Sequence, residues 1–216
     1  PFVNNWDDYG GMNQYTEWAM PFVTVNGMQF ETDGVPFYFT GANFWSAMNL
    51  ASNGTGGDRA RLDRELDFLA SQGVTVLRVM AGTEGPDTEL ARVVPALQVA
   101  PGVYNQDLLD GLDYLMYAMK KRGMYAVMCL TNFWNWSGGM SQYHNWFAGG
   151  PLPIRQPMTG SSNSAFMDYT EDFYLNTAAM QAYKDHFDFV ATRLNPYTGI
   201  AYKDEPAIMA WEHAND

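Results

Sequence analysis

The sequence has little cysteine, histidine or basic charge. Its 216 residues include a single cysteine, Cys129, and three histidines. One cysteine cannot form an internal disulfide bond, and together these residues do not supply the ligand set of a zinc site. We therefore predict neither a metal ion nor a cofactor.

Basic residues are outnumbered two to one by acidic residues. Twelve lysines and arginines stand against 24 aspartates and glutamates, which gives a net charge of −12. Such a chain repels phosphate backbones and anionic lipid, so we predict no nucleic acid and no membrane as partners. The chain has no apolar run of roughly 18 residues, and residues 1–11 lack the features of a signal peptide. A neutral ligand fits this composition better.

Aromatic residues, in contrast, are abundant. Seven tryptophans, 13 tyrosines and 13 phenylalanines make up 15% of the chain, and hydrophobic residues make up 47%. This content is enough for one substantial core and excludes a disordered chain. Because it exceeds what a core of this size needs, we expect some of the rings to face a ligand.

Hydrophobic periodicity predicts strands that alternate with helices. A hairpin over 22–31 is expected first, because Asn26-Gly27 suits a tight I′ turn. Asp58 is a plausible N-cap of the first helix, in which leucines recur at helical spacing. The predicted strands are 36–41, 74–80, 124–130 and 207–211, and the predicted helices are 58–71, 107–122 and 170–193.

The order of these elements predicts an α/β fold with a parallel sheet. The segments that follow the strands, at 46–57, 81–106 and 132–157, are long, whereas the returns from helix to strand are short. This asymmetry favours a (β/α)8 barrel of the TIM type, with about the first four strand-helix units in this chain and a site at the strands' carboxyl ends. A doubly wound nucleotide-binding sheet is the alternative, but no glycine-rich phosphate-binding motif follows a predicted strand.

The first residues repeat a later part of the chain. Residues 1–18 align without a gap on residues 129–146 and match at eight of 18 positions. Three or more evenly spaced copies would be needed for a solenoid. We predict that residues 1–18 are a fragment or join that duplicates part of the loop after the third strand, and that residues 19–216 form the domain.

Two places combine polar residues with strand ends. Arg78 interrupts the apolar strand 74–80 and needs an anionic partner. Asn215 and Asp216 follow the last predicted strand, so all three side chains could converge at the mouth of a barrel. The alternative for Arg78 is a structural ion pair, and for Asp216 it is a chain end with no defined role.

The segment 132–139 places two tryptophans and an amide directly after the third strand. Flat rings stack on the apolar faces of sugars while amides bond hydroxyl groups, so this segment suits a neutral polysaccharide. The alternative for Trp134 and Trp136 is packing under the long loop, and Trp45 is open to both interpretations. Glu84 is a substrate contact or, as we favour, an acid in a solvated loop. The three histidines, His144, His186 and His213, are expected to be hydrogen-bonded structural residues.

Five segments occur in an order that resembles a known family. They read FVTVNG at 22–27, FTGANFW at 39–45, VLRVM at 76–80, NFWNWSGG at 132–139 and AWEHAN at 210–215. Together they resemble endo-β-1,4-mannanases of glycoside hydrolase family 5, and residues 1–11 resemble the aromatic loop of another branch of that family. The resemblance covers residues 20–216 and implies a secreted hydrolase whose partner is β-mannan or its oligosaccharides.

The resemblance also implies a (β/α)8 barrel and a retaining double displacement by two carboxyl groups. In that mechanism Arg78 supports the nucleophile, Asn215 bonds the sugar 2-hydroxyl, and residue 216 is the acid/base. The residues expected to bind substrate are Asn43, Trp45, Glu84, Asn132, Trp134 and Trp136.

The sequence departs from the family at two points. Asp216 stands where the family has glutamate, and the family's nucleophilic glutamate follows a seventh strand, for which no residue here substitutes by motif. We therefore expect the chain to be the N-terminal half of a longer hydrolase and to be inactive by itself, with Asp216 a misread glutamate. The alternatives are a half barrel that binds β-glycan without catalysis and a cellulase-type β-1,4-glucanase of the same family.

Overall fold

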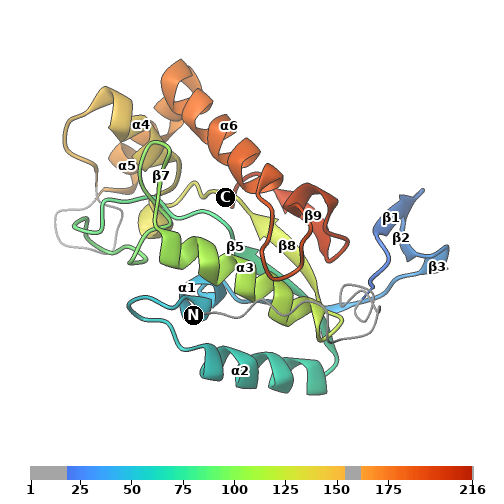
Figure 1. Cartoon of the computed structure of the whole chain (residues 1–216). Helices are drawn as coiled ribbons and strands as arrows, with labels where there is room; N and C mark the ends of the chain where they lie inside the picture. The colour runs from blue at the N-terminus through green and yellow to red at the C-terminus, as the bar shows by residue number, and fades with distance from the viewer. Residues whose placement is uncertain (1–18, 154–161, 216) are drawn as a thin grey trace.

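The computed structural model describes residues 19–153 and 162–215. Its centre is a parallel sheet in the order β4 (Thr40–Asn43), β5 (Val74–Met80), β8 (Tyr125–Cys129) and β9 (Ile208–Glu212). The strands follow one another across the sheet in the order in which they occur along the chain (Figure 1). In a doubly wound sheet the strand order would instead reverse at one point. The predicted α/β class is confirmed, and the part described is consistent with the opening units of a (β/α) barrel.

Helices cover one face of this sheet. The core joins β5 and β8 to α1 (Ala47–Ala51), α2 (Arg59–Ser71), α3 (Gln106–Lys120) and α6 (Thr177–Thr192). The predicted cap of α2 is confirmed, because the Asp58 carboxylate accepts a hydrogen bond from the Arg61 backbone N–H at 2.8 Å. Leu62 and Leu66 of α2 are fully buried, as the leucine spacing predicts.

Strand register separates an outer from an inner face of the sheet. Leu77, Ala126 and Ile208 lie side by side and belong to the core beneath the helices. Arg78 and Val127, the next residues along β5 and β8, point to the opposite face because successive side chains alternate, and a register shift in the pairing with β9 places Ala210 beside Val127. Arg78 therefore lies on the inner face, away from the helices.

The predicted helix 170–193 is wrong as a single element. The chain forms α5 (Asn163–Glu171), a 3-10 helix η3 (Asp172–Leu175) and then α6. The break follows from Asn176, whose side-chain oxygen accepts from the Ala179 N–H at 3.1 Å and so caps a new helix.

Three predicted loops also contain regular structure. The segment 46–57 holds α1, and the segment 81–106 holds a small hairpin of β6 (Gln98–Ala100) and β7 (Val103–Tyr104). The segment 132–157 holds a 3-10 helix η2 (Asn135–Ser137) and α4 (Gly139–Ala148). A further 3-10 turn, η4 (Tyr202–Asp204), leads into β9.

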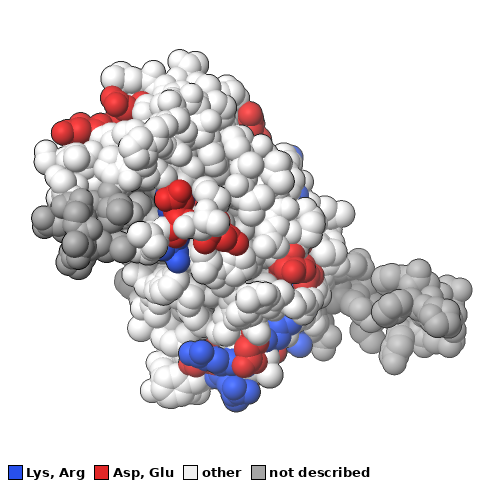
Figure 2. Space-filling view, turned by 90° about the vertical axis from the view of Figure 1, so that its left-hand side faces the viewer, with Lys and Arg blue, Asp and Glu red and all other residues white. Residues whose placement is uncertain are grey.

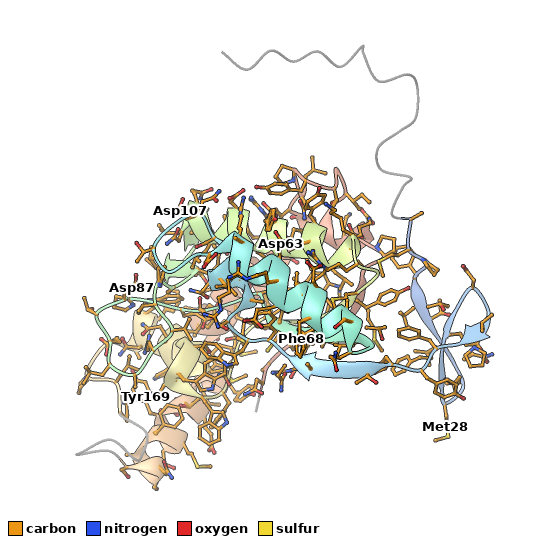
Figure 3. The ribbon with its side chains drawn as sticks, turned by 90° about the horizontal axis from the view of Figure 1, so that it is seen from below. Met28, Asp63, Phe68, Asp87, Asp107 and Tyr169 are labelled. Atoms are coloured by element: carbon orange, nitrogen blue, oxygen red, sulfur yellow. The ribbon has the colours of Figure 1, made fainter. Side chains whose placement is uncertain are left out.

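The N-terminal hairpin is attached at the amino ends of the barrel strands. It consists of β1 (Val23–Asn26), β2 (Gln29–Thr32) and β3 (Val35–Pro36), so the predicted strand 36–41 is divided between β3 and β4. Tyr125, at the start of β8, donates its hydroxyl to the Pro21 carbonyl at 2.9 Å and meets the Phe37 ring edge-on at 5.2 Å. Met28 marks the far tip of the hairpin in Figure 3. The carboxyl ends of the strands are thus left to the long loops.

Charged side chains are sparse on the face shown in Figure 2. Basic groups gather at its lower edge beside acidic ones, and most of the face is uncharged. Among the described residues, none of the helices combines the length and apolarity that crossing a lipid bilayer requires. The predicted duplicate at residues 1–18 lies outside the described residues.

A buried ion pair ties α3 to the turn before β9. Lys120 donates to both oxygens of Glu205 at 2.8 and 3.1 Å, and the two side chains are only 6% and 4% exposed. Replacing Lys120 with methionine is expected to lower the free energy of unfolding by about 3–5 kcal/mol, because Glu205 stays buried without its counter-charge. Urea denaturation measures the effect. The matched change Lys203→Met, at an exposed position, should alter stability by less than about 0.5 kcal/mol; equal effects would contradict the prediction.

Candidate active site

An arginine–carboxylate pair lies at the carboxyl ends of the parallel strands. Arg78 of β5 donates Nε and Nη2 to the two oxygens of Glu212 at 2.5 and 2.6 Å. The pair reaches across β8, and both side chains are partly buried, at 24% and 28% exposure. The anionic partner that Arg78 was predicted to need is therefore Glu212.

The same guanidinium fixes the amide of Asn215. Arg78 Nη2 donates to Asn215 Oδ1 at 2.9 Å, and Asn215 Nδ2 donates to Asn132 Oδ1 at 2.8 Å. The backbone N–H of Phe133 donates to the Asn215 carbonyl at 2.7 Å, so the segments after β8 and β9 are also joined by main chain. The predicted convergence of Arg78 and Asn215 is confirmed, and Asp216 lies outside the described residues.

Cys129 separates the two members of the ion pair. It lies on the strand between them, and its Sγ is 3.5 Å from Arg78 Nη2 and donates to the Thr131 carbonyl at 3.2 Å. Burial raises the pKa of the thiol to about 12, so it stays protonated at neutral pH and does not act as a nucleophile. Asn43 Oδ1 accepts a longer bond from Arg78 Nη1 at 3.4 Å.

Sequence reasoning gave Glu212 no role. The segment AWEHAN predicts a role for the asparagine at its end and none for its glutamate. Alternation along the strand was the available signal, since Ala210 and Glu212 fall on one face and Ala210 shares a row with Arg78. A basic and an acidic residue on the same inner face of neighbouring strands are the expected partners of an ion pair.

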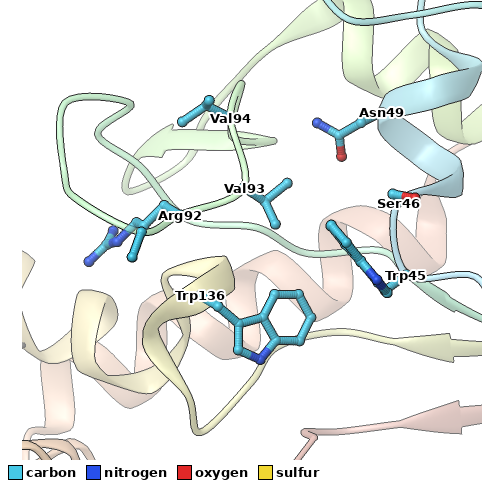
Figure 4. A pocket seen from close by; sticks show the side chains of 8 residues that line it. Trp45, Ser46, Asn49, Arg92, Val93, Val94 and Trp136 are labelled. Atoms are coloured by element: carbon cyan, nitrogen blue, oxygen red, sulfur yellow. The ribbon is translucent and has the colours of Figure 1, made fainter. Parts of the chain in front are cut away.

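Two aromatic residues in the loops after β4 and β8 line a cavity. Trp45 follows β4 and Trp136 lies in η2, and their rings meet edge to face with centroids 5.6 Å apart. They border a cavity of about 590 Å³ whose other wall includes Arg92, Val93 and Val94 of the loop after β5 (Figure 4). The Arg92 guanidinium points away from the two rings in this view. Trp45 is 48% exposed, so the cavity is open to a ligand.

Two residues predicted to bind substrate occupy other environments. Asn132 is fully buried and orients the loop, because its Oδ1 also accepts from the Trp134 N–H at 3.1 Å. Trp134 stacks on Phe166 with ring centroids 5.8 Å apart, which covers one face of its indole. The structure therefore corrects the direct sugar contact expected of Asn132, whereas a role for Trp134 stays a prediction.

Glu84 is the largest correction. It is 1% exposed, not in a solvated loop and not placed for direct substrate contact. Its carboxylate accepts from the Gly139 N–H at 2.7 Å and from the Thr131 hydroxyl at 3.3 Å. Burial raises the pKa of this carboxyl to about 7, against the opposing effect of these bonds. Glu84 stands in the segment GTEG at 82–85, where nothing local in the sequence reveals the neighbouring loop that covers it.

The histidines are hydrogen-bonded, as predicted. His186 is buried, with Nε2 3.1 Å from the Ala81 carbonyl and Nδ1 3.2 Å from the Tyr104 hydroxyl. Burial lowers its pKa to about 4, so it is neutral at pH 7. His144 and His213 contact Asn176 and Tyr183 in the same manner. Within the ranges that the structure describes, no cluster of three or more His, Cys, Asp or Glu side chains could hold a metal ion.

Comparison with known families identifies related proteins. A family model described as GH family 5 beta-mannosidase-like matches residues 20–216. The chain is 34% identical to mannan endo-1,4-beta-mannosidase 5 of Solanum lycopersicum and 35% identical to putative mannan endo-1,4-beta-mannosidase 9 of Oryza sativa subsp. japonica, each over 195 residues. These alignments cover 90% of this chain and 42% of each relative, so the chain spans less than half of their length.

Solved structures give the same picture. The glycoside hydrolase family 5 mannosidase from Rhizomucor miehei superposes with a TM-score of 0.84 at 38% identity, over 90% of this chain and 48% of that chain. An endo-1,4-beta-mannanase from the same organism superposes with a TM-score of 0.69 at 28% identity, over 90% and 48%.

The pair of Arg78 and Glu212 should be energetically coupled. A double-mutant cycle of Arg78→Met and Glu212→Leu is expected to give a coupling free energy of about 1–3 kcal/mol, because two charge-assisted hydrogen bonds form in a partly buried site. Urea denaturation of the four proteins measures it. The exposed pair Arg61 and Glu65, at 60% and 44% exposure, is the control and should give less than about 0.5 kcal/mol. Equal coupling in both pairs would refute the assignment.

Proposed function

The chain belongs to the glycoside hydrolase family 5 beta-mannosidase-like family, and from this premise we propose that the protein hydrolyses internal β-1,4 bonds of mannan. The proposal includes β-mannan or mannooligosaccharide as the partner and secretion as the setting. One observation carries it: Arg78, Glu212 and Asn215 form a single hydrogen-bonded network at the carboxyl ends of the strands, and the loops that follow β4, β5 and β8 line a cavity with two tryptophans. Barrel hydrolases place their reacting groups at this face.

In this proposal Asn215 holds a sugar hydroxyl. Its amide cannot rotate freely, because Oδ1 accepts from Arg78 and Nδ2 donates to Asn132. A fixed amide next to the cleavage point would bond the 2-hydroxyl and strengthen that bond in the transition state. Residue 216, the next in the chain, would then be the acid/base.

Arg78 would act through its charge. The retaining mechanism needs a second carboxylate about 5–5.5 Å from the acid/base, which attacks the anomeric carbon. Glu212 already holds Arg78 in one orientation through both of its oxygens. A guanidinium fixed in this way would favour the ionised form of an attacking carboxylate on the same inner face. We assign that carboxylate to none of the described residues.

The tryptophan cavity would bind sugar units away from the cleaved bond. The planes of Trp45 and Trp136 are inclined at 70°, so the two rings form a corner rather than a stack. Pyranose rings present C–H groups that pack on such aromatic faces, and the polar groups of Ser46 and Asn49 lie at the same cavity. A neutral ligand also matches the chain's net charge of −12.

A second candidate is a β-mannosidase that releases single mannose units. The observation in its favour is that identity and TM-score are higher for the Rhizomucor miehei mannosidase, 38% and 0.84, than for the mannanase of that organism, 28% and 0.69. The description of the matched family also reads beta-mannosidase-like.

Product analysis tests both candidates. Because the attacking carboxylate is assigned to none of the described residues, mannohexaose is incubated with a complete barrel that contains this chain. The products are separated by anion-exchange chromatography, with carboxymethylcellulose as the control substrate. Endo hydrolysis yields mannobiose to mannotetraose early, whereas a mannosidase yields mannose at every time point. Asn215→Ala should slow either reaction roughly 100-fold, since one transition-state hydrogen bond is lost. Cleavage of cellulose but not mannan, or no loss in the variant, would refute the proposal.

The tryptophan corner gives a separate prediction for binding. Trp136→Ala is expected to weaken mannohexaose binding about tenfold, because one of the two stacking faces is lost. Isothermal titration calorimetry measures the dissociation constant. Trp211→Phe is the matched control, since Trp211 packs against Phe187 at 5.8 Å outside the cavity and should leave binding unchanged. Loss in both variants would point to general destabilisation and against the assignment.

A further inference from the structure

The turn that carries Trp136 rests on Glu84. The Glu84 carboxylate accepts from the Gly139 N–H at 2.7 Å, at the start of α4. The Glu84 backbone N–H donates to the Ser137 carbonyl at 2.7 Å, at the end of η2. Main chain and side chain of one residue therefore hold both ends of the Gly138 turn.

Close backbone contact leaves this turn little freedom to shift. Gly138 has φ +95°, and a Cβ added there would lie 2.2 Å from the Glu84 carbonyl oxygen. Gly139 has φ +64°, and its added Cβ would lie 2.1 Å from the Asn132 carbonyl oxygen. Only glycine fits both the backbone conformation and the space. The turn is thus pressed directly against Glu84.

The opposite wall of the tryptophan cavity depends on the same residue. Arg92 Nη1 donates to the Glu84 carbonyl at 3.0 Å and to Gln142 Oε1 at 2.6 Å. The next residue, Val93, donates its backbone N–H to the Trp136 carbonyl at 2.7 Å. Glu84 therefore contacts the segments that form two sides of the cavity, one bearing Trp136 and the other bearing Arg92 and Val93.

We propose that Glu84 is a positioning residue that sets the distance between the Trp136 turn and the Arg92 loop, and through them the shape of the cavity. That the cavity binds mannan rests on the proposed function, whereas the coupling of Glu84 to the turn does not. Glu84 itself is buried and does not touch the ligand.

The hydrogen bonding around Glu84 makes this coupling sensitive to its charge. Within the described part of the chain, three buried donors near Glu84 lack a hydrogen-bond acceptor: Arg92 Nε, Gln98 Nε2 and Gln142 Nε2. An ionised carboxylate can accept bonds that a protonated carboxyl accepts less strongly. Ionisation is therefore expected to draw the surrounding donors, and the turn with them, toward Glu84.

The ionisation falls near neutral pH. Burial raises the pKa of Glu84 to about 7, since no cation pairs directly with its carboxylate in the described chain. The other ionisable groups that face it are neutral at that pH, apart from Arg92. The neutral groups are Tyr104 of β7, Cys129 of β8, Tyr143 of α4 and Tyr183 of α6, and His186 contacts Tyr104.

The sign of the effect on stability follows from the raised pKa. An unfolded glutamate loses its proton near pH 4.5, whereas folded Glu84 keeps it to about pH 7. The contribution of Glu84 to stability is therefore full below pH 4.5 and is lost as the pH rises through about 7. Glu84→Gln, which resembles the protonated form at every pH, should lack this loss.

Tryptophan emission tests the coupling without any ligand. The emission of the full chain is recorded from pH 5 to 9 for the unchanged protein, Glu84→Gln and the exposed loop control Glu89→Gln. A transition near pH 7 is expected in the unchanged protein and in the control, and it should vanish in Glu84→Gln. It should also vanish in Trp136→Phe, which places the signal at the turn. A transition that persists in Glu84→Gln overturns the proposal, and so does one that survives loss of Trp136.

Mannohexaose binding is the second readout. Glu84→Ala is expected to weaken binding roughly tenfold at pH 8, whereas Glu84→Gln should bind as the unchanged protein does at pH 5.5 and should show no dependence on pH. Equal binding by all variants at both pH values overturns the positioning role. Absence of binding by the unchanged protein counts against the proposed function instead, and the emission titration then still decides the role of Glu84.

Discussion

The charge of Arg78 on an otherwise apolar strand is the constraint on which the site depends. A guanidinium that is three-quarters removed from water needs an anion, and none lies on its own strand or on the neighbouring β8. Glu212 of β9 meets this need across the intervening strand, where it pairs in register with Cys129. The ion pair therefore fixes β5 and β9 relative to each other across β8. Further N–H groups of the same guanidinium donate to the side-chain oxygens of Asn43 and Asn215 and orient these two amides.

A second layer of polar contacts builds the loops on this base. Asn132 orients Asn215 on one side and the Trp134 backbone on the other, although it is itself fully buried. In the same way, the buried Glu84 carboxylate accepts a hydrogen bond from the Gly139 N–H and holds the turn at Gly138 and Gly139 in place. The residues that would meet a sugar are thus held by buried amides and a buried carboxyl, which lose their freedom on folding rather than on binding.

Much of the sheet and its outer helices could be predicted from the sequence, because the pattern there is local. The apolar run from Val74 to Met80 predicts a strand, and the spacing of the leucines in α2 and α3 predicts helices. The break before α6 depends on one capping asparagine, Asn176, which a hydrophobic pattern does not register. Arg78 could be found because it interrupts an apolar strand, and Asn215 because it follows a strand end. Glu212 and Glu84 could not, since their partners are 134 and 55 residues away along the chain.

The two glutamates show why residue type alone does not assign a role. Glu212 is shared with a guanidinium, so its charge is balanced and it serves to hold Arg78 in place. Glu84 is buried more completely and has only hydrogen-bond donors around its carboxylate, so its charge is costly near neutral pH. Glu212 thus has Arg78 as its counter-charge, whereas no cation pairs directly with the Glu84 carboxylate in the described chain, and burial raises the pKa of that carboxyl to about 7. The position of the aromatic turn depends on Glu84, because the Glu84 carboxylate accepts from the Gly139 N–H and Gly138 packs against the Glu84 carbonyl oxygen.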